Sequence, residues 1–263
     1  EAVDIDQNWA VSGSPGRPGS YAELYDSVDH GFLDDLGAAY VFHLKNGQWL
    51  EWQRLLAMDR DASDLFGASV QIYSDQIAVA APGESNSGKV YLHRLNSLGQ
   101  WVPEATLQPQ NLQDGQDFGK EIALDGNTLI VSAPNLQPEL FIYQEQTSGW
   151  TLTATESSFS SLATSEFGSA MDLKNDTVVV GAPGHNGQGS VVLYRLVNGS
   201  LAIIQQLFAS DGSSGRRFGH SVCRDGNQLL VGDPNAEKVY LFEINGSTWT
   251  ETQILQAPQP KGG

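Results

Sequence analysis

Residues 167–194 read FGSAMDLKNDTVVVGAPGHNGQGSVVLY, and the order of residue types in this stretch recurs along the chain. Phe-Gly pairs begin at Phe66, Phe118, Phe167 and Phe218, at intervals of 52, 49 and 51 residues. In each copy a proline follows 16 residues after the Phe, at Pro82, Pro134, Pro183 and Pro234. A period of about 50 residues with fixed internal spacing predicts a repeat architecture.

Each repeat is predicted to hold four short antiparallel strands. A strand-like run follows the Phe-Gly pair, and a turn rich in Asn and Asp then leads to a β-branched run that ends at the proline. A third run is rich in aromatic residues. A Trp opens a fourth run in four of the five repeats, at Trp49, Trp101, Trp150 and Trp249. Four strands in about 50 residues make one blade of a β-propeller.

The repeat pattern therefore predicts an all-β fold, a β-propeller of about five four-stranded antiparallel blades. We expect one propeller domain over residues 1–263, with repeats at approximately 1–65, 66–117, 118–166, 167–217 and 218–263. The first repeat lacks its own Phe-Gly pair, and the chain has no initiator Met. We therefore expect a mature or excised piece, and flanking sequence that supplies further blades remains an alternative to a closed ring of five.

The pattern resembles the FG-GAP repeats of integrin α-subunit propellers and of many bacterial surface proteins. Phe167-Gly168, Gly181-Ala182-Pro183 and Gly189-Ser190 form the copy most similar to the family motif. The resemblance implies a β-propeller whose Phe-Gly and Gly-Ala-Pro elements pack blade against blade. It also implies a secreted or cell-surface protein.

One feature departs from the integrin pattern. Integrin-type repeats often carry a calcium loop between the two motif halves, whereas this interval holds only two or three turn residues here. Calcium needs six to eight oxygen ligands, which so short a turn does not supply. The chain is more similar to calcium-free bacterial repeats, so we expect no cofactor, with calcium left as a weaker alternative.

Composition narrows the classes of partner. The net charge of −17 disfavours nucleic acid, because binding to the phosphate backbone relies on Lys and Arg. No run of 18 apolar residues predicts a membrane span. The single cysteine, Cys223, is predicted to be buried. Asn175, Asn198 and Asn245 begin Asn-x-Ser/Thr sequons at predicted turns, and their glycosylation remains open.

The loop after each proline and the linker before each Phe-Gly pair are predicted to lie on one face of the propeller, because strand direction alternates. The first repeat has a long insertion on this face: 22 residues separate Pro15 from Gly37, against 6 between Pro82 and Gly88. Long loops on a rigid scaffold are often functional. The candidate binding residues of this insertion are Tyr21, Tyr25, Asp26, Asp29, His30, Phe32, Asp34 and Asp35. A structural covering role is the alternative.

Other candidate sites are weaker. Asp59, Asp61 and Asp64 could contribute to a metal site, although their spacing matches no known calcium loop. The Trp residues at repeat-equivalent positions favour packing between blades over sugar binding. His93 is also predicted to pack, and the histidines show no metal-ligand spacing. Motifs of catalytic serine, zinc or phosphate-loop sites are missing from the sequence.

These observations predict a non-enzymatic extracellular binding or adhesion module whose loop face recognises a protein or a glycan. A second hypothesis is a structural subunit of an extracellular filament or surface assembly, with self-assembly through blade edges. A third is a polysaccharide-acting hydrolase or lyase, which would need two carboxylates on the loop face.

Overall fold

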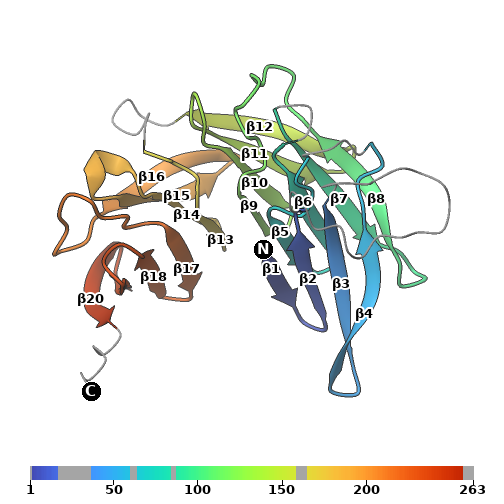
Figure 1. Ribbon diagram of the computed structural model, residues 1–263, viewed down its shortest axis with the longest axis horizontal. Helices are drawn as coiled ribbons and strands as arrows, with labels where there is room; N and C mark the ends of the chain where they lie inside the picture. Colours follow the sequence, from blue (N-terminus) through green and yellow to red (C-terminus); the bar gives the residue numbers. More distant parts are fainter. Residues whose placement is uncertain (1, 17–36, 60–63, 84–86, 158–164, 257–263) are drawn as a thin grey trace. The chain divides into compact units, whose positions relative to one another are not determined.

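The computed structural model describes residues 2–16, 37–59, 64–83, 87–157 and 165–256, and the strands in these ranges form five four-stranded sheets (Figure 1). Within each sheet the strands pair in the order in which they occur in the sequence. The fold is an all-β propeller with one repeat per blade, which confirms the predicted fold class.

The sheets follow one another along the chain. The first contains β1 (Val3–Asp6), β2 (Trp9–Ser14), β3 (Ala38–Lys45) and β4 (Gln48–Leu55). The second contains β5 (Val70–Tyr73), β6 (Gln76–Ala81), β7 (Lys89–Leu95) and β8 (Trp101–Leu107). The third contains β9 (Ile122–Asp125), β10 (Thr128–Ala133), β11 (Glu139–Gln146) and β12 (Gly149–Ser157). The fourth contains β13 (Met171–Lys174), β14 (Thr177–Ala182), β15 (Ser190–Val197) and β16 (Ser200–Leu207). The fifth contains β17 (Ser221–Asp225), β18 (Gln228–Asp233), β19 (Lys238–Asn245) and β20 (Thr248–Gln256).

The chain divides into two compact units. Unit 1 comprises Glu1–Asn135 and Glu145–Thr151, and unit 2 comprises Leu136–Gln144 and Leu152–Gly263. Sheets 1 and 2 therefore belong to unit 1, and sheets 4 and 5 belong to unit 2. The third sheet contributes strands to both units.

Within each unit, one sheet packs on the next through its apolar face. In unit 2, Val179, Val191, Leu193 and Leu207 of sheet 4 share a buried cluster with residues of the fifth repeat: Phe218, Leu229, Val231, Tyr240, Phe242 and Trp249. We call the face that a sheet turns toward the next repeat its forward face. In unit 1, the forward face of sheet 1 (Val11, Ala39, Val41 and Leu55) packs in the same way on residues of the second repeat that include Phe66 and Trp101.

The Phe-Gly pairs anchor these interfaces. All four phenylalanines are fully buried. The glycine that follows the Phe lies against the preceding sheet: a Cβ atom added to Gly13 would lie 1.9 Å from the carbonyl oxygen of Gly67, and one added to Gly181 would lie 2.0 Å from that of Gly219. Backbones this close leave no space for a side chain, which explains glycine on both sides of these contacts.

The fourth strand contains a β-bulge, which the sequence pattern does not predict. In sheet 4 the register shifts between Leu193 and Tyr194, and an equivalent shift occurs in sheets 1, 2 and 5. A bulge redirects the strand locally. After the shift, Gln205 lies opposite Leu193 and its side chain reaches the next sheet.

Two such glutamines form a pair of hydrogen bonds with the backbone of one residue in the next repeat, and we call each arrangement an amide clamp. Gln205 donates from Nε2 to the carbonyl of Trp249 at 2.9 Å and accepts the Trp249 N–H at Oε1 at 2.9 Å. Gln53 makes the same pair of hydrogen bonds with Trp101, at 2.7 and 2.9 Å. The side-chain amide therefore replaces a strand partner for the Trp at the start of the next fourth strand, which is the first residue of β8 and the second residue of β20.

Replacing Gln205 with alanine should lower the free energy of unfolding by about 1 kcal/mol, because the N–H and C=O of Trp249 lose their partners in a partly buried position. Urea unfolding at pH 7 measures the change. Gln253→Ala is the matched control: Gln253 occupies the same repeat position, opposite Leu241, but is exposed. Equal losses in the two variants would contradict the role of the clamp.

Two burial predictions need correction. Trp101 and Trp249 are buried as predicted, at 1% and 3% exposed, but Trp49 is 42% exposed. Cys223, predicted to be buried, is exposed, because it lies opposite Leu230 on the forward face of sheet 5. His93 is buried, which confirms its packing role.

Candidate functional site

The segments before the Phe-Gly pairs and after the prolines do meet on one face. The N–H of Gly184 donates to the carbonyl of Ser165 at 2.9 Å, and the N–H of Gly83 donates to that of Asp64 at 3.1 Å. In sheet 5 the side-chain amide of Asn235 donates to the carbonyl of Gly215 at 2.8 Å. These contacts confirm the predicted loop face for the described residues.

In unit 2 this face carries an ion pair between two repeats. Arg217 precedes Phe218, and its Nη1 and Nη2 atoms lie 2.9 and 2.5 Å from the two carboxylate oxygens of Glu166, which precedes Phe167. A bidentate pair of this kind fixes the orientation of both groups. The Arg217 hydrogen bonds lower the pKa of Glu166, and the charge of His220 acts in the same direction. Glu166 is therefore a carboxylate at neutral pH.

A buried carboxylate lies beside this pair. Asp233 is 1% exposed, and its Oδ1 accepts the backbone N–H of Arg217 at 3.0 Å and that of Ala236 at 3.1 Å. Its Oδ2 is buried and has no hydrogen-bond partner among the described residues. A buried carboxylate oxygen without a partner is costly, so its retention calls for an explanation.

The other repeats lack this carboxylate. The residue before the repeat proline is Ser14 in the first repeat, and Ala81, Ala133 and Ala182 in the next three. Asp233 therefore replaces a small residue in one repeat only. Comparison of the repeats contains this signal, although the pattern of a single repeat predicts only the end of a β-branched run at this position.

Two histidines belong to the same unit. His220 is exposed, and its backbone N–H donates to the carbonyls of Arg217 and Gly232 at 3.1 and 3.2 Å. His185 lies in the short 3-10 helix η3 (His185–Gly187) and is buried near Phe208. Burial lowers the pKa of His185, which favours its neutral form. We call Glu166, Arg217, His220 and Asp233 the loop-face cluster.

Unit 1 has one carboxyl with a strongly altered pKa. Burial raises the pKa of Glu121 to about 7, although a hydrogen bond with the Ser69 side chain opposes the shift. The backbone around it is fixed, because the N–H of Glu121 donates to Ser132 Oγ at 3.0 Å and that of Ile122 donates to Ser69 Oγ at 3.3 Å. A carboxyl that is half protonated near neutral pH is a candidate proton donor.

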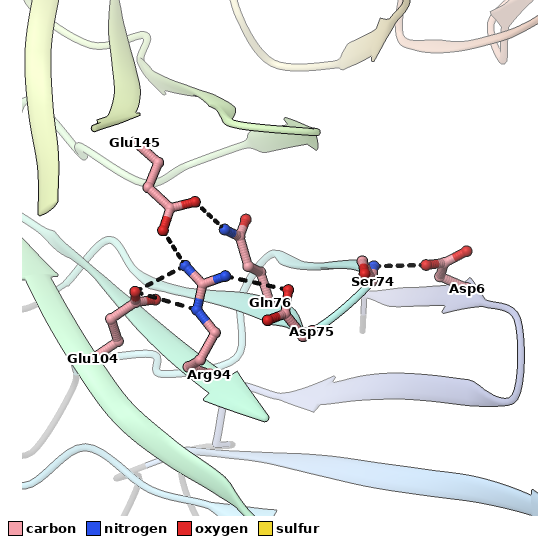
Figure 2. A network of polar contacts seen from close by, with 7 residues as sticks. All are labelled: Asp6, Ser74, Asp75, Gln76, Arg94, Glu104 and Glu145. Atoms are coloured by element: carbon pink, nitrogen blue, oxygen red, sulfur yellow. Dashed lines mark hydrogen bonds and ion pairs between the residues drawn. The ribbon is translucent and has the colours of Figure 1, made fainter. Parts of the chain in front are cut away.

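Unit 1 also contains a network of charged groups on a different part of the sheets (Figure 2). Arg94 of β7 contacts three carboxylates: Glu104 at 2.8 Å, Asp75 at 3.2 Å and Glu145. Gln76 donates to the other oxygen of Glu145 at 2.6 Å. The arginine already occupies the space between the carboxylates, so this group is structural.

The structure describes only some of the candidate residues that were predicted from the sequence. The insertion residues Tyr21, Tyr25, Asp26, Asp29, His30, Phe32, Asp34 and Asp35 lie outside the described residues, as does Asp61. Asp64 is buried. Asp59 accepts hydrogen bonds from Lys89 at 2.7 Å and from Tyr91 at 2.8 Å.

The hydrogen bonds of Asp59 recur at Asp211, three repeats later in the sequence. Asp211 contacts Lys238, and it accepts a hydrogen bond from Tyr240 at 2.7 Å. Asp59 and Asp211 each precede a repeat Phe by seven residues, so this arrangement is part of the repeat and joins the linker to the third strand. Among the described residues, no three His, Cys, Asp or Glu side chains gather in a way that could hold a metal ion. No helix in the described ranges has the length and apolarity to cross a membrane.

Comparisons with known proteins agree with the fold. The model of the FG-GAP repeat family matches residues 49–93 and 203–246. No curated protein sequence matches the chain. A periplasmic gluconolactonase of Pseudomonas aeruginosa has a similar structure, with a TM-score of 0.62 and 12% identity over 97% of this chain and 71% of that chain. A putative 6-phosphogluconolactonase of Bacteroides uniformis is similar with a TM-score of 0.61 and 9% identity, over 84% of this chain and 64% of that chain.

These findings correct the leading functional prediction. Both similar structures are named as enzymes, and neither name refers to adhesion. The prediction of a non-enzymatic binding or adhesion module is therefore wrong, and its hydrolase alternative is better supported. At such low identity the likeness itself shows the fold alone. The chain thus carries FG-GAP repeats in a β-propeller of five four-stranded blades.

Proposed function

We propose that this protein is a hydrolase that opens a cyclic ester of a sugar acid, with the loop-face cluster as its catalytic site. The observation that carries the proposal is the ion pair of Glu166 with Arg217 beside the buried, unpaired carboxylate oxygen of Asp233, with His220 three residues after Arg217. The likeness in fold to the two lactonase structures supports the choice of lactones as the first substrate class.

The chemistry needs a base and an electrostatic stabiliser. His220 takes a proton from water, and the water oxygen attacks the carbonyl carbon of the lactone. The guanidinium of Arg217 stabilises the negative charge that develops on the carbonyl oxygen. The ring C–O bond then breaks, and the departing alkoxide takes the proton from His220, which leaves a hydroxy acid.

The other two residues position this machinery. Glu166 uses both carboxylate oxygens to hold Arg217, and two of the five guanidinium N–H groups serve this pair. Asp233 holds the backbone of Arg217 by accepting its N–H at Oδ1.

The binding role predicted for the long insertion of the first repeat stays a separate prediction beside this proposal. Its aromatic and acidic residues, such as Tyr21, Tyr25 and Asp29, are the types that stack on sugar rings and accept their hydroxyl groups. A secreted or cell-surface location agrees with the FG-GAP repeats and with the periplasmic relative in fold.

The test is lactone hydrolysis followed by acid release in a pH-stat, with glucono-δ-lactone as the probe and the spontaneous rate subtracted. We expect turnover by the wild-type chain and a loss of about 100-fold or more in kcat/KM for His220→Gln. Asp225→Asn is the matched control, because Asp225 forms an exposed ion pair with Lys174 in the same unit. This control should keep wild-type activity.

Two outcomes would refute the proposal. One is a wild-type rate equal to the buffer rate. The other is full activity in His220→Gln while its melting curve is unchanged. Release of reducing ends from polysaccharides without any lactone turnover would instead favour a glycoside hydrolase or lyase.

A further inference from the structure

A lysine and an aspartate are held together in unit 2, at the start of the third strand of sheet 5. Lys238 contacts Oδ2 of Asp211, and the hydroxyl of Tyr240 donates to Oδ1 of the same carboxylate at 2.7 Å. Tyr240 is fully buried, and the side chains of Lys238 and Asp211 are 17% and 34% exposed. The amine nitrogen therefore lies against the carboxyl group, while a fixed donor binds the other carboxyl oxygen.

A second carboxylate lies beside this group. Asp233 is the cross-strand neighbour of Lys238, so the two side chains lie on the same face of sheet 5, with Cβ atoms about 5 Å apart. Asp233 is 1% exposed, and its Oδ2 has no hydrogen-bond partner among the described residues. Burial, the hydrogen bond to Asp211 and the charges of Asp211 and Asp233 raise the pKa of Tyr240. Tyr240 therefore stays a neutral hydrogen-bond donor beside two acidic groups.

We propose that Lys238 and Asp211 condense to an isopeptide bond, with Asp233 as the group that transfers the protons. Nζ of Lys238 attacks Cγ of Asp211, the bond between Nζ and Cγ forms, and the bond between Cγ and Oδ2 breaks. The ammonium group gives up two protons in turn to Asp233, which delivers both to the departing Oδ2. One water leaves, and Asp233 ends as the carboxylate that it was at the start. The Tyr240 hydroxyl stabilises the negative charge that develops on Oδ1.

The ion pair alone is not expected to react. Hydrogen bonds from Lys238 and Tyr240 lower the pKa of Asp211, and neither a carboxylate nor an ammonium group is in its reactive form. A buried base beside Lys238 removes this obstacle, because the nitrogen can lose a proton without transfer to bulk water. The linkage gives a reason for the retention of a buried, unpaired carboxylate oxygen at this position. It involves no substrate, so it is independent of the proposed hydrolase activity.

Unit 1 contains the same lysine, aspartate and tyrosine without the additional carboxylate. Lys89 lies 2.7 Å from Asp59, and the hydroxyl of Tyr91 donates to Asp59 at 2.8 Å. The cross-strand neighbour of Lys89 is Ala81. We therefore expect this pair to remain an ion pair, which provides a control in the same chain.

The test is a peptide map of the folded chain, incubated at pH 7 until its intact mass no longer changes. Trypsin cleaves after Lys and Arg, so an unlinked chain yields separate peptides with Asp211 (residues 196–216) and Lys238 (residues 225–238). The isopeptide bond blocks cleavage after Lys238. Mass spectrometry should therefore find residues 196–216 joined to residues 225–261, with loss of one water.

The variants separate the roles of the three groups. Asp233→Ala should slow formation of the joined peptide about 100-fold, and it should fold because three other repeats have alanine at this position. Lys238→Met should abolish the linkage. Ala81→Asp supplies the missing carboxylate opposite Lys89, so it should create a second linkage between Lys89 and Asp59 that the wild type lacks. Melting curves check that each variant is folded.

Three results would overturn the proposal. The first is a wild-type chain that still yields separate peptides after incubation. The second is a joined peptide that forms at the wild-type rate in Asp233→Ala, because Asp233 would then have no part in the reaction. The third is loss of water within residues 196–216 alone, which would identify a cyclic imide at Asp211-Gly212 instead of a linkage to Lys238.

Discussion

Replacing Arg94 with methionine is expected to lower the free energy of unfolding by about 3 kcal/mol at pH 7. Arg94 is the one cation among Asp75, Glu104 and Glu145, and its contacts with the two glutamates are only about a quarter exposed (Figure 2). Without the guanidinium, three carboxylates face one another with partial loss of water. Removal of one partner from a partly buried ion network costs far more than loss of an exposed pair.

Urea unfolding of wild type, Arg94→Met and Arg94→Met/Glu145→Gln measures this effect. The second substitution removes one of the unpaired charges, so the double variant should recover part of the lost stability. Lys174→Met is the matched control, since its ion pair with Asp225 lies on the exposed surface and should contribute little. Wild-type stability in Arg94→Met would contradict a structural role for the network.

The fold could be predicted because its signals are local. Each hairpin has its turn residues and its strand alternation within a dozen residues, so Met171–Lys174 and Thr177–Ala182 follow directly from the sequence around Asn175. The exposed fraction of a side chain could not be predicted in this way, because it depends on whether another sheet covers the face on which the side chain lies. Trp49 and Trp101 occupy the same position in the repeat, yet one is 42% and the other 1% exposed. Repeat position predicts the direction of a side chain but not its neighbour.

The candidate site was harder to predict, although the period contains part of the answer. Glu166 and Arg217 are 51 residues apart, and so are Arg94 and Glu145. Side chains one period apart on adjacent sheets can meet, so opposite charges at this separation could have been paired from the sequence. Comparison of the repeats distinguishes Asp233 from the small residues at the equivalent positions, but its unpaired oxygen depends on the surrounding backbone and so required the structure.

Glu121→Gln should make the protein more stable than wild type above pH 7 and leave it nearly unchanged at pH 4.5. Burial raises the folded-state pKa of Glu121 to about 7 from an ordinary value of 4.5. The folded state therefore binds this proton more tightly than the unfolded state. Its contribution to stability is fully present below pH 4.5 and is lost as the pH rises toward 7.

The size of the effect follows from the same shift. Each pKa unit corresponds to about 1.4 kcal/mol. The shift from 4.5 to about 7 therefore lowers the unfolding free energy of the wild type by about 3 kcal/mol between pH values well below 4.5 and well above 7. The glutamine variant carries no such penalty, so the difference in unfolding free energy between variant and wild type should grow with pH. Urea unfolding at pH 4.5, 6 and 8 measures it, with the exposed Glu237→Gln as control.

A second substitution separates burial from hydrogen bonding. Ser69 stabilises the ionised form of Glu121, so Ser69→Ala should raise the pKa further and make wild-type stability fall more steeply between pH 6 and 8. In the Glu121→Gln background, Ser69→Ala should add no pH dependence, because the titrating group is gone. A difference between Glu121→Gln and wild type that stays constant from pH 4.5 to 8 would mean that Glu121 ionises normally in the folded protein.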